Sequence, residues 1–229
     1  MVLEDKSYVP TLAVRASEMN GLEYLPGATK NLMTPCFLLA PWANSNSLDR
    51  TVDRIERAFP NRAYFLDIDR DYALTNLENG PQRDLAQLLL PDDNFANWVA
   101  FVGQHEYAMP CIQTAGQSEA QIRAQIGEFQ RLGRPYSMRI VLDRFPSNLH
   151  EIINAFSASG AADFAIILEG GWTRDPLTLA AWFAGIVGGA LDVIDASVPI
   201  VLSCTSIPKM FNEFSADNPS IVEFTNRIL

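Results

Sequence analysis

Seven short apolar runs recur along the chain, and a segment with helical spacing follows each of them. They occupy residues 8–15, 34–41, 63–69, 110–115, 136–145, 163–171 and 199–206. Most are continuously apolar rather than alternating, which is typical of strands that are covered on both faces. No hairpin signal joins consecutive runs. The repeat therefore predicts a parallel α/β protein, in which helices connect and cover the strands.

The segments between the runs carry recognisable helix boundaries. Ser118 followed by Gln121 predicts a capping box at the start of one helix. Asp175 followed by proline predicts the N-cap of another. The long connection from residue 70 to residue 109 is less regular, and we expect it to hold a loop and short helices around residues 85–90 and 95–103.

A (β/α) barrel of the TIM type contains eight units, and seven units at rather even spacing nearly complete that number. We therefore favour such a barrel, formed as one domain by residues 1–229. A doubly wound open sheet is the alternative. The count stops one strand short, since no strand is predicted in the C-terminal run NPSIVEFTNRIL. Two explanations stay open: the chain is cut before its eighth strand, or another segment closes the barrel.

The charge balance excludes several classes of function. Asp and Glu number 27 against 17 Lys and Arg, which gives a net charge of −10. Proteins that bind nucleic acids or anionic membranes need clustered basic residues, so neither partner is expected. The content of hydrophobic residues, 48%, excludes a disordered chain.

Further features favour a soluble cytoplasmic protein. No signal peptide is recognisable at the N-terminus. The uncharged stretch 176–191 is shorter than the roughly 20 apolar residues that a transmembrane helix needs. Cys36, Cys111 and Cys204 are far apart and each lies in an apolar run, so we expect buried free thiols rather than disulfides or a zinc site.

Polar residues follow the carboxyl ends of the predicted strands, where parallel barrels form their active sites. The candidate catalytic groups, which would act as acid, base or cation ligands, are the carboxylates of Asp67, Asp69, Asp143 and Glu169. Asp67 and Asp69 lie two residues apart on one strand, so we expect both side chains on the same face. The candidate substrate-binding residues are Arg15, Trp42, Gln113, Arg139, Ser203 and Thr205.

A structural interpretation of the same charges stays open. Local ion pairs on a solvated turn also explain Asp69 and Arg70. A structural salt bridge inside the barrel also explains Arg139. Gly170 and Gly171 are expected to form the turn after the sixth strand, although two glycines also allow a phosphate to approach backbone amides.

No motif identifies a cofactor or a metal site. The patterns G-x-G-x-x-G, Walker A, G-x-S-x-G and H-E-x-x-H do not occur in the sequence. His105 and His150 are expected on helix surfaces, so we expect no histidine-based triad and no metal site. The cofactor and the oligomeric state stay undetermined.

The opening YVPTLAVRASE, the strand TPCFLLAP and the strand AYFLDID resemble the phage-type beta protein family. The matching positions are Tyr8, Val9, Pro10 and Glu18; Thr34, Pro35 and Pro41; Asp67; Arg139; and Ser206, Ile207 and Pro208. The resemblance spans the whole chain. It implies a barrel-like α/β fold and a setting in phages, prophages and bacterial defence or toxin-neutralising loci, and it implies no established catalytic activity.

Two positions depart from the family pattern. The family's first-strand lysine is Ala13 here, and its second-strand glutamate is Leu38. Family members also run on to an eighth strand. If the lysine and the glutamate serve a shared site, this chain has lost much of that site.

Two hypotheses about function follow. The first is an accessory or defence-type scaffold that binds another protein without catalysis. The second is a barrel hydrolase or lyase that acts on a small anionic or phosphorylated substrate, with the strand-end carboxylates as catalytic groups and an arginine as the anion clamp. The contacts of Asp67, Arg139 and Glu169 distinguish the two hypotheses. If these side chains pair with one another and are sealed from solvent, the enzyme hypothesis is excluded.

Overall fold

The computed structural model describes residues 3, 6, 8–159, 163–173 and 175–205, whose strands form two parallel sheets. The first sheet has the order β1-β2-β3-β4, and the second has the order β5-β6-β7. The strands are β1 (Thr11–Ala13), β2 (Cys36–Leu39), β3 (Tyr64–Ile68), β4 (Ala108–Pro110), β5 (Tyr136–Val141), β6 (Phe164–Trp172) and β7 (Ile200–Thr205). Each predicted run contains or overlaps a strand, and the prediction of a parallel α/β protein is confirmed.

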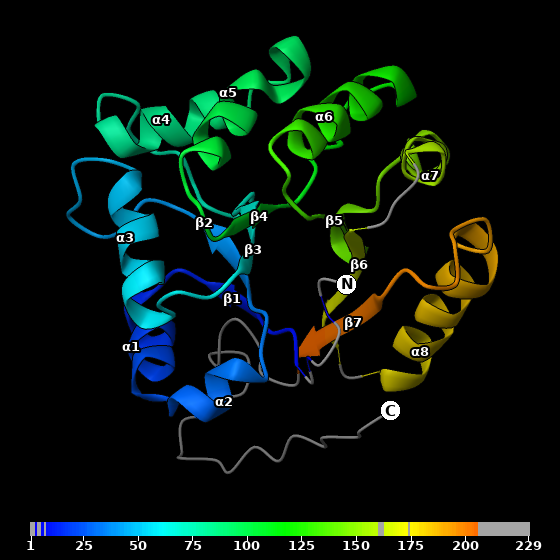
Figure 1. Cartoon of the computed structure of the whole chain (residues 1–229), viewed down its shortest axis with the longest axis horizontal. Helices are drawn as coiled ribbons and strands as arrows, with labels where there is room; N and C mark the ends of the chain where they lie inside the picture. The colour runs from blue at the N-terminus through cyan, green and yellow to red at the C-terminus, as the bar shows by residue number, and fades with distance from the viewer. Residues whose placement is uncertain (1–2, 4–5, 7, 160–162, 174, 206–229) are drawn as a thin grey trace, which may run out of the picture.

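Helices connect these strands and lie outside them as an arc in Figure 1. They are α1 (Ala16–Tyr24), α2 (Gly27–Asn31), α3 (Asp49–Ala58), α4 (Gly80–Leu88), α5 (Asp92–Gly103), α6 (Glu119–Arg131), α7 (Leu149–Ala158) and α8 (Pro176–Gly185), with a 3₁₀ turn η1 (Leu142–Arg144) and a π turn η2 (Ile186–Ala190). The predicted capping box of Ser118 and Gln121 is present at α6, and Asp175 caps α8. None of the described helices combines the length and the apolar character that crossing a bilayer requires.

The two sheets meet at two junctions, which differ. At the β4–β5 junction, Cys111 and Ser137 form a parallel bridge, and the Ile112 amide donates to the Ser137 carbonyl at 2.9 Å. At the β7–β1 junction, Thr11 Oγ1 and Ser203 Oγ lie 3.3 Å apart, but no backbone pairing joins the two strands in the described ranges. The predicted closed TIM barrel is therefore not seen. The final run NPSIVEFTNRIL and the Ser206–Pro208 match lie outside the described residues.

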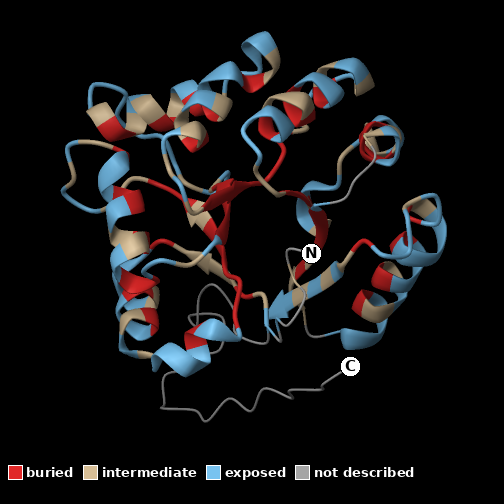
Figure 2. Ribbon diagram, in the orientation of Figure 1, coloured by how far each residue is buried: buried red, intermediate tan, exposed pale blue. Residues whose placement is uncertain are grey.

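Alternating side chains divide the interior into two cores. The larger core lies between the sheets and the helices and includes Phe37, Trp98, Phe129 and Phe156. The smaller core fills the space enclosed by the strands. Its fully buried members are Cys36, Phe65, Met109, Cys111, Ala165 and Ile167. Figure 2 shows β2 to β6 mostly buried, whereas β7 is largely exposed.

The two glycines expected in a turn lie instead inside strand β6. A Cβ atom at Gly170 would lie 2.2 Å from Cδ1 of Leu179 on α8, so only glycine allows this helix to pack so closely on the strand. Gly171 has a φ of +63°, which glycine adopts without strain. The close helix contact explains Gly170, and the left-handed backbone conformation explains Gly171.

The expectations for thiols and histidines hold in part. Cys36 and Cys111 are buried free thiols, but Cys204 is exposed on β7. His150 is exposed on α7. His105 follows α5 rather than lying on its surface, and its Nε2 is 3.6 Å from Asp49 Oδ1.

Candidate functional site

The inner face of the strands changes from apolar to charged toward the carboxyl ends. Asp67 lies two residues beyond Phe65 on β3, and Glu169 lies two residues beyond Ile167 on β6. Successive side chains alternate between the faces of a strand, so each charged residue points to the same side as the apolar residue two positions before it. The charges therefore sit directly above the smaller core.

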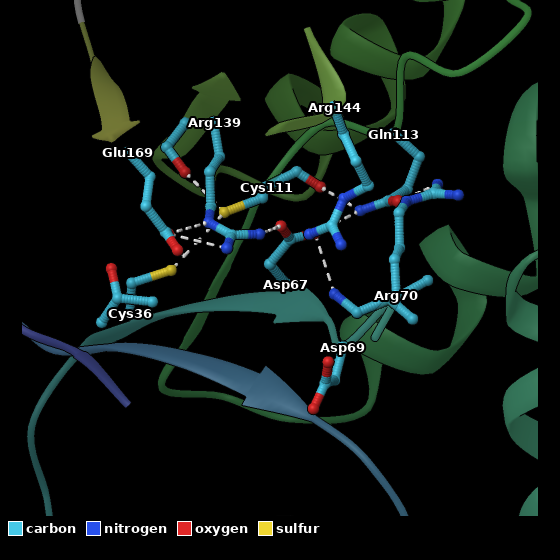
Figure 3. Close-up of polar contacts among 12 residues, drawn as sticks. Cys36, Asp67, Asp69, Arg70, Cys111, Gln113, Arg139, Arg144 and Glu169 are labelled. Atoms are coloured by element: carbon cyan, nitrogen blue, oxygen red, sulfur yellow. Dashed lines mark hydrogen bonds and ion pairs between the residues drawn. The ribbon is translucent and has the colours of Figure 1, made fainter. Parts of the chain in front are cut away.

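Arg139 forms ion pairs with two of the predicted carboxylates (Figure 3). Its Nη1 lies 2.7 Å from Asp67 Oδ2, and its Nη2 lies 2.7 Å from Glu169 Oε2. The side chain of Arg139 is 4% exposed, against 10% for Asp67 and 19% for Glu169. We call these residues the ion-pair triad. It joins β3 of the first sheet to β5 and β6 of the second.

The triad fixes the protonation state of Arg139. Burial alone would lower the pKa of this guanidinium, but neighbouring negative charge, that of Asp67 foremost, outweighs burial and raises the pKa. A permanently charged arginine holds both carboxylates as hydrogen-bond acceptors. The pairing expected of a structural salt bridge is present, although Glu169 keeps some contact with solvent.

Asp67 is held by amides as well as by arginine. Its Oδ1 accepts hydrogen bonds from Gln113 Nε2 at 2.7 Å and from the amide of Ile68 at 2.8 Å. The backbone amide of Gln113 donates to Gln125 Oε1 at 2.7 Å, and Gln125 on α6 is fully buried. Both oxygens of Asp67 are thus occupied by donors within the protein.

Two buried thiols lie directly below the triad. Cys36 Sγ and Cys111 Sγ are 4.0 Å apart, and Cys111 Sγ is 3.0 Å from Ser137 Oγ. Burial, followed by the neighbouring Cys36, raises the pKa of Cys111 well above its ordinary value. A protonated thiol is a poor nucleophile, so Cys111 contributes packing rather than covalent chemistry.

A cavity of about 320 Å³, here called the mouth cavity, opens beside the triad at the carboxyl ends of β3, β4 and β5. Its walls include the side chains of Asp67, Arg70, Gln113, Arg139, Arg144 and Asn148. Arg70 Nη2 donates to Gln113 Oε1 at 2.7 Å, and Arg144 forms an ion pair with Asp71. Gln113 and Arg139, both predicted to bind substrate, thus line one cavity.

Sequence analysis did not select Arg70 or Arg144 as site residues. Arg70 directly follows the predicted strand 63–69, and Arg144 lies near the end of the predicted strand 136–145. Selecting every arginine at a strand end, as was done for Arg15, would have found both. A different feature of the sequence could have identified Gln125. It is a polar residue on the apolar stripe that Ile122 and Phe129 define on α6.

Several predicted site residues lie away from the triad. Asp69 and Arg15 line a separate cavity of about 220 Å³. Asp69 follows the last residue of β3, and its Oδ1 accepts a hydrogen bond from the amide of Asp71, so it does not share the site of Asp67. Asp143 is exposed on η1. Trp42 packs against Arg54, whose Cζ lies 5.5 Å from the ring centroid.

Ser203 and Thr205 line a third cavity, of about 630 Å³, at the β7–β1 junction. We call it the seam cavity. Thr11 and Leu38 contribute to its walls from the first sheet, and Glu169 contributes from the second. The described ranges contain no group of three or more His, Cys, Asp or Glu side chains arranged to hold a metal ion.

The two positions that depart from the family pattern lie in register with the triad. Ala13 on β1 pairs with Leu38 on β2, and Leu38 pairs in turn with Asp67 on β3. A lysine and a glutamate at these positions would extend the charged layer across three neighbouring strands. Here the layer is apolar on β1 and β2.

The fold and the site define a parallel α/β protein whose strand-end charges are paired largely with one another. The chain belongs to the Beta protein family, whose model matches residues 8–229. It is 23% identical over 224 residues to "Protein beta" of Enterobacteria phage P4, a match that covers 94% of this chain. The chain spans 59% of the length of that relative. No solved structure matches the chain.

Proposed function

We propose that this member of a phage-associated family acts in the cytoplasm as a non-catalytic, accessory or defence-type scaffold that binds another protein, of which a toxin is one example. The observation that carries the proposal is the ion-pair triad. General acid–base catalysis needs a carboxylate that reaches the substrate and changes its protonation state. Asp67 and Glu169 are instead committed to a buried arginine.

The β7–β1 junction supports the choice of a protein as the partner. Within the described residues, β7 pairs only with β6 and β1 pairs only with β2, so each presents an edge. Leu202 of β7 is 52% exposed. An extended segment of a partner can add to such an edge through backbone hydrogen bonds. The net charge of −10 favours a basic partner.

The proposal is tested by co-purification from a host that carries the native operon. Three tagged chains are compared: the wild type, Leu202→Arg at the β7 edge, and Leu177→Arg on α8. Leu177 is 76% exposed and provides a matched control. We expect one specific protein with the wild type and the control, and its loss with Leu202→Arg. No specific partner, or equal loss with both variants, would refute the proposal.

One observation favours the alternative function, a hydrolase or lyase that acts on a small anionic or phosphorylated substrate. The mouth cavity lies at the strand ends, where barrel enzymes bind substrates, and it holds three guanidinium groups. The alternative requires turnover that depends on a carboxylate of the site. Release of phosphate from sugar phosphates, or elimination from them, that is present in the wild type and absent in Asp67→Asn would establish it.

A further inference from the structure

The mouth cavity contains two arginines that the ion-pair triad does not use. Three arginines line it, and Asp67 is the only carboxylate among the described lining residues. Arg139 and Arg144 each pair with carboxylates. Arg70 instead donates to the neutral amide of Gln113, and it forms no ion pair within the part of the chain that the structure describes. Among the described lining arginines, Arg70 is thus the one whose donors are not committed to a carboxylate.

The guanidinium of Arg70 is fixed at the cavity wall. The residue as a whole is exposed, but its polar end reaches the buried side chain of Gln113. Loss of hydration at this end lowers the pKa of Arg70; Asp67 opposes the change, and the charges of Arg144 and Arg139 reinforce it. Cations held close together in this way gain stability from a bound anion.

The rim of the cavity adds backbone donors. Gly116 lies in the loop between β4 and α6 with a φ of +70°, and the amides of Ala115 and Gly116 donate no hydrogen bond to any described residue. Consecutive free amides beside a left-handed residue can form an anion-binding concavity. Asn148 Nδ2 donates to the Thr114 carbonyl at 3.1 Å, which holds this loop against the loop after β5.

We propose that the mouth cavity binds the phosphate group of a small phosphorylated metabolite, with Arg70 and Arg144 as the principal ligands. Arginine presents a planar fork of donors that matches two phosphate oxygens, and two such forks suit a dianion. No aromatic side chain is among the described lining residues, so the cavity offers a nucleobase no stacking partner. Its volume of about 320 Å³ fits a small ester rather than a polymer.

This site needs no turnover and does not depend on the proposed protein partner. Inorganic phosphate and a sugar phosphate share the recognised chemistry, so both serve as probes. Isothermal titration calorimetry with the purified full chain compares inorganic phosphate with ribose 5-phosphate, and sodium chloride at equal ionic strength controls for screening. The protein variants are Arg70→Ala, Arg144→Ala and the control Arg50→Ala, whose side chain is 65% exposed on α3.

The wild type is expected to bind one of the two phosphates saturably and with a stoichiometry of one. Each cavity variant should weaken binding by about tenfold or more, since a hydrogen bond between charged groups is lost, whereas Arg50→Ala should leave it unchanged. Tighter binding of the ester identifies a metabolite, and equal binding identifies phosphate itself as the ligand. No saturable binding of either probe, or equal weakening in Arg50→Ala, would overturn the proposal. Circular dichroism verifies that each variant is folded.

Discussion

The two junctions between the sheets are built in different ways. The β4–β5 junction combines a backbone bridge with the ion pair between Asp67 and Arg139, and it is buried. The β7–β1 junction has a side-chain contact between Thr11 and Ser203 beside a cavity of about 630 Å³. One set of strands thus produces both a braced junction and an open one.

The difference shows why charges at strand ends are ambiguous in a sequence. Asp67 and Glu169 occupy the positions at which a barrel enzyme places catalytic carboxylates. In this chain they join the two sheets through Arg139 instead. Between β7 and β1 the described residues form no such brace, and these strand edges carry the proposed partner site.

The largest effect is expected at the brace. Replacing Arg139 with methionine leaves the buried Asp67 and the partly buried Glu169 without their counter-charge, so Arg139→Met should lower the free energy of unfolding by about 3–5 kcal/mol. Urea denaturation followed by circular dichroism measures the change. A loss below about 1 kcal/mol, the value typical of exposed ion pairs, would mean that the triad does not brace the junction.

A triple variant separates unpaired charge from lost packing. Asp67→Leu, Glu169→Leu and Arg139→Met together remove the charges along with their pairing. This variant should be clearly more stable than Arg139→Met alone, because no buried charge is left without a partner. Equal instability of the two variants would indicate that shape, rather than charge, determines the effect.

An engineered disulfide tests the open junction. Thr11 Oγ1 and Ser203 Oγ are 3.3 Å apart, so Thr11→Cys with Ser203→Cys should form a bond under mild oxidation, in a Cys204→Ser background that removes the exposed thiol. Closing so long a loop should stabilise the fold by about 2–4 kcal/mol. Thermal unfolding with and without reductant measures the difference. If the thiols stay free, the junction is wider than the structure indicates.

The sequence predicted the strands well, because their signals are local. Continuous apolar runs marked each strand, and Ser118 with Gln121 marked the start of α6 correctly. The carboxyl ends of parallel strands converge, which is why Asp67, Arg139 and Glu169 lie in one layer. What these residues do there depends on distances between strands that are far apart in sequence.

Other features depend on tertiary structure alone. Asp69 leaves the layer of Asp67 because β3 ends at Ile68, and strand boundaries are the least certain part of a sequence prediction. The turn expected at Gly170 is wrong because the helix that approaches this residue is not visible in the local sequence. Even strand spacing does not specify closure, so the count of seven strands leaves open whether the barrel closes between β7 and β1.

A smaller effect is expected from the buried amide that supports Gln113. Gln125→Leu removes the acceptor of the Gln113 amide, which should cost about 1–3 kcal/mol because a buried donor loses its partner. Gln87→Leu, at an exposed position of α4, should change stability by less than about 0.5 kcal/mol. Urea denaturation of both variants gives the comparison. Equal changes would show that the amide network adds nothing to the braced junction.

The smallest effect concerns pH at the base of the β4–β5 junction. Burial lowers the pKa of His105 from 6.5, and although Asp49 opposes this shift, the charge of Arg134 reinforces it. The unfolded chain therefore binds a proton more readily than the folded one, so the free energy of unfolding should fall as the pH drops below about 6.5. His105→Gln should reduce this dependence. An unchanged pH profile in the variant would exclude His105 as the cause.

Hydrogen–deuterium exchange of the free protein, followed by mass spectrometry, tests the contrast between the junctions most directly. One sample reports on both, through peptides that cover Tyr136–Val141 of β5 and Ile200–Thr205 of β7. We predict slow exchange in β5 and markedly faster exchange in β7, because buried hydrogen bonds protect amides and an open strand edge does not. Equal protection of the two strands would contradict the assignment of a braced junction and an open one.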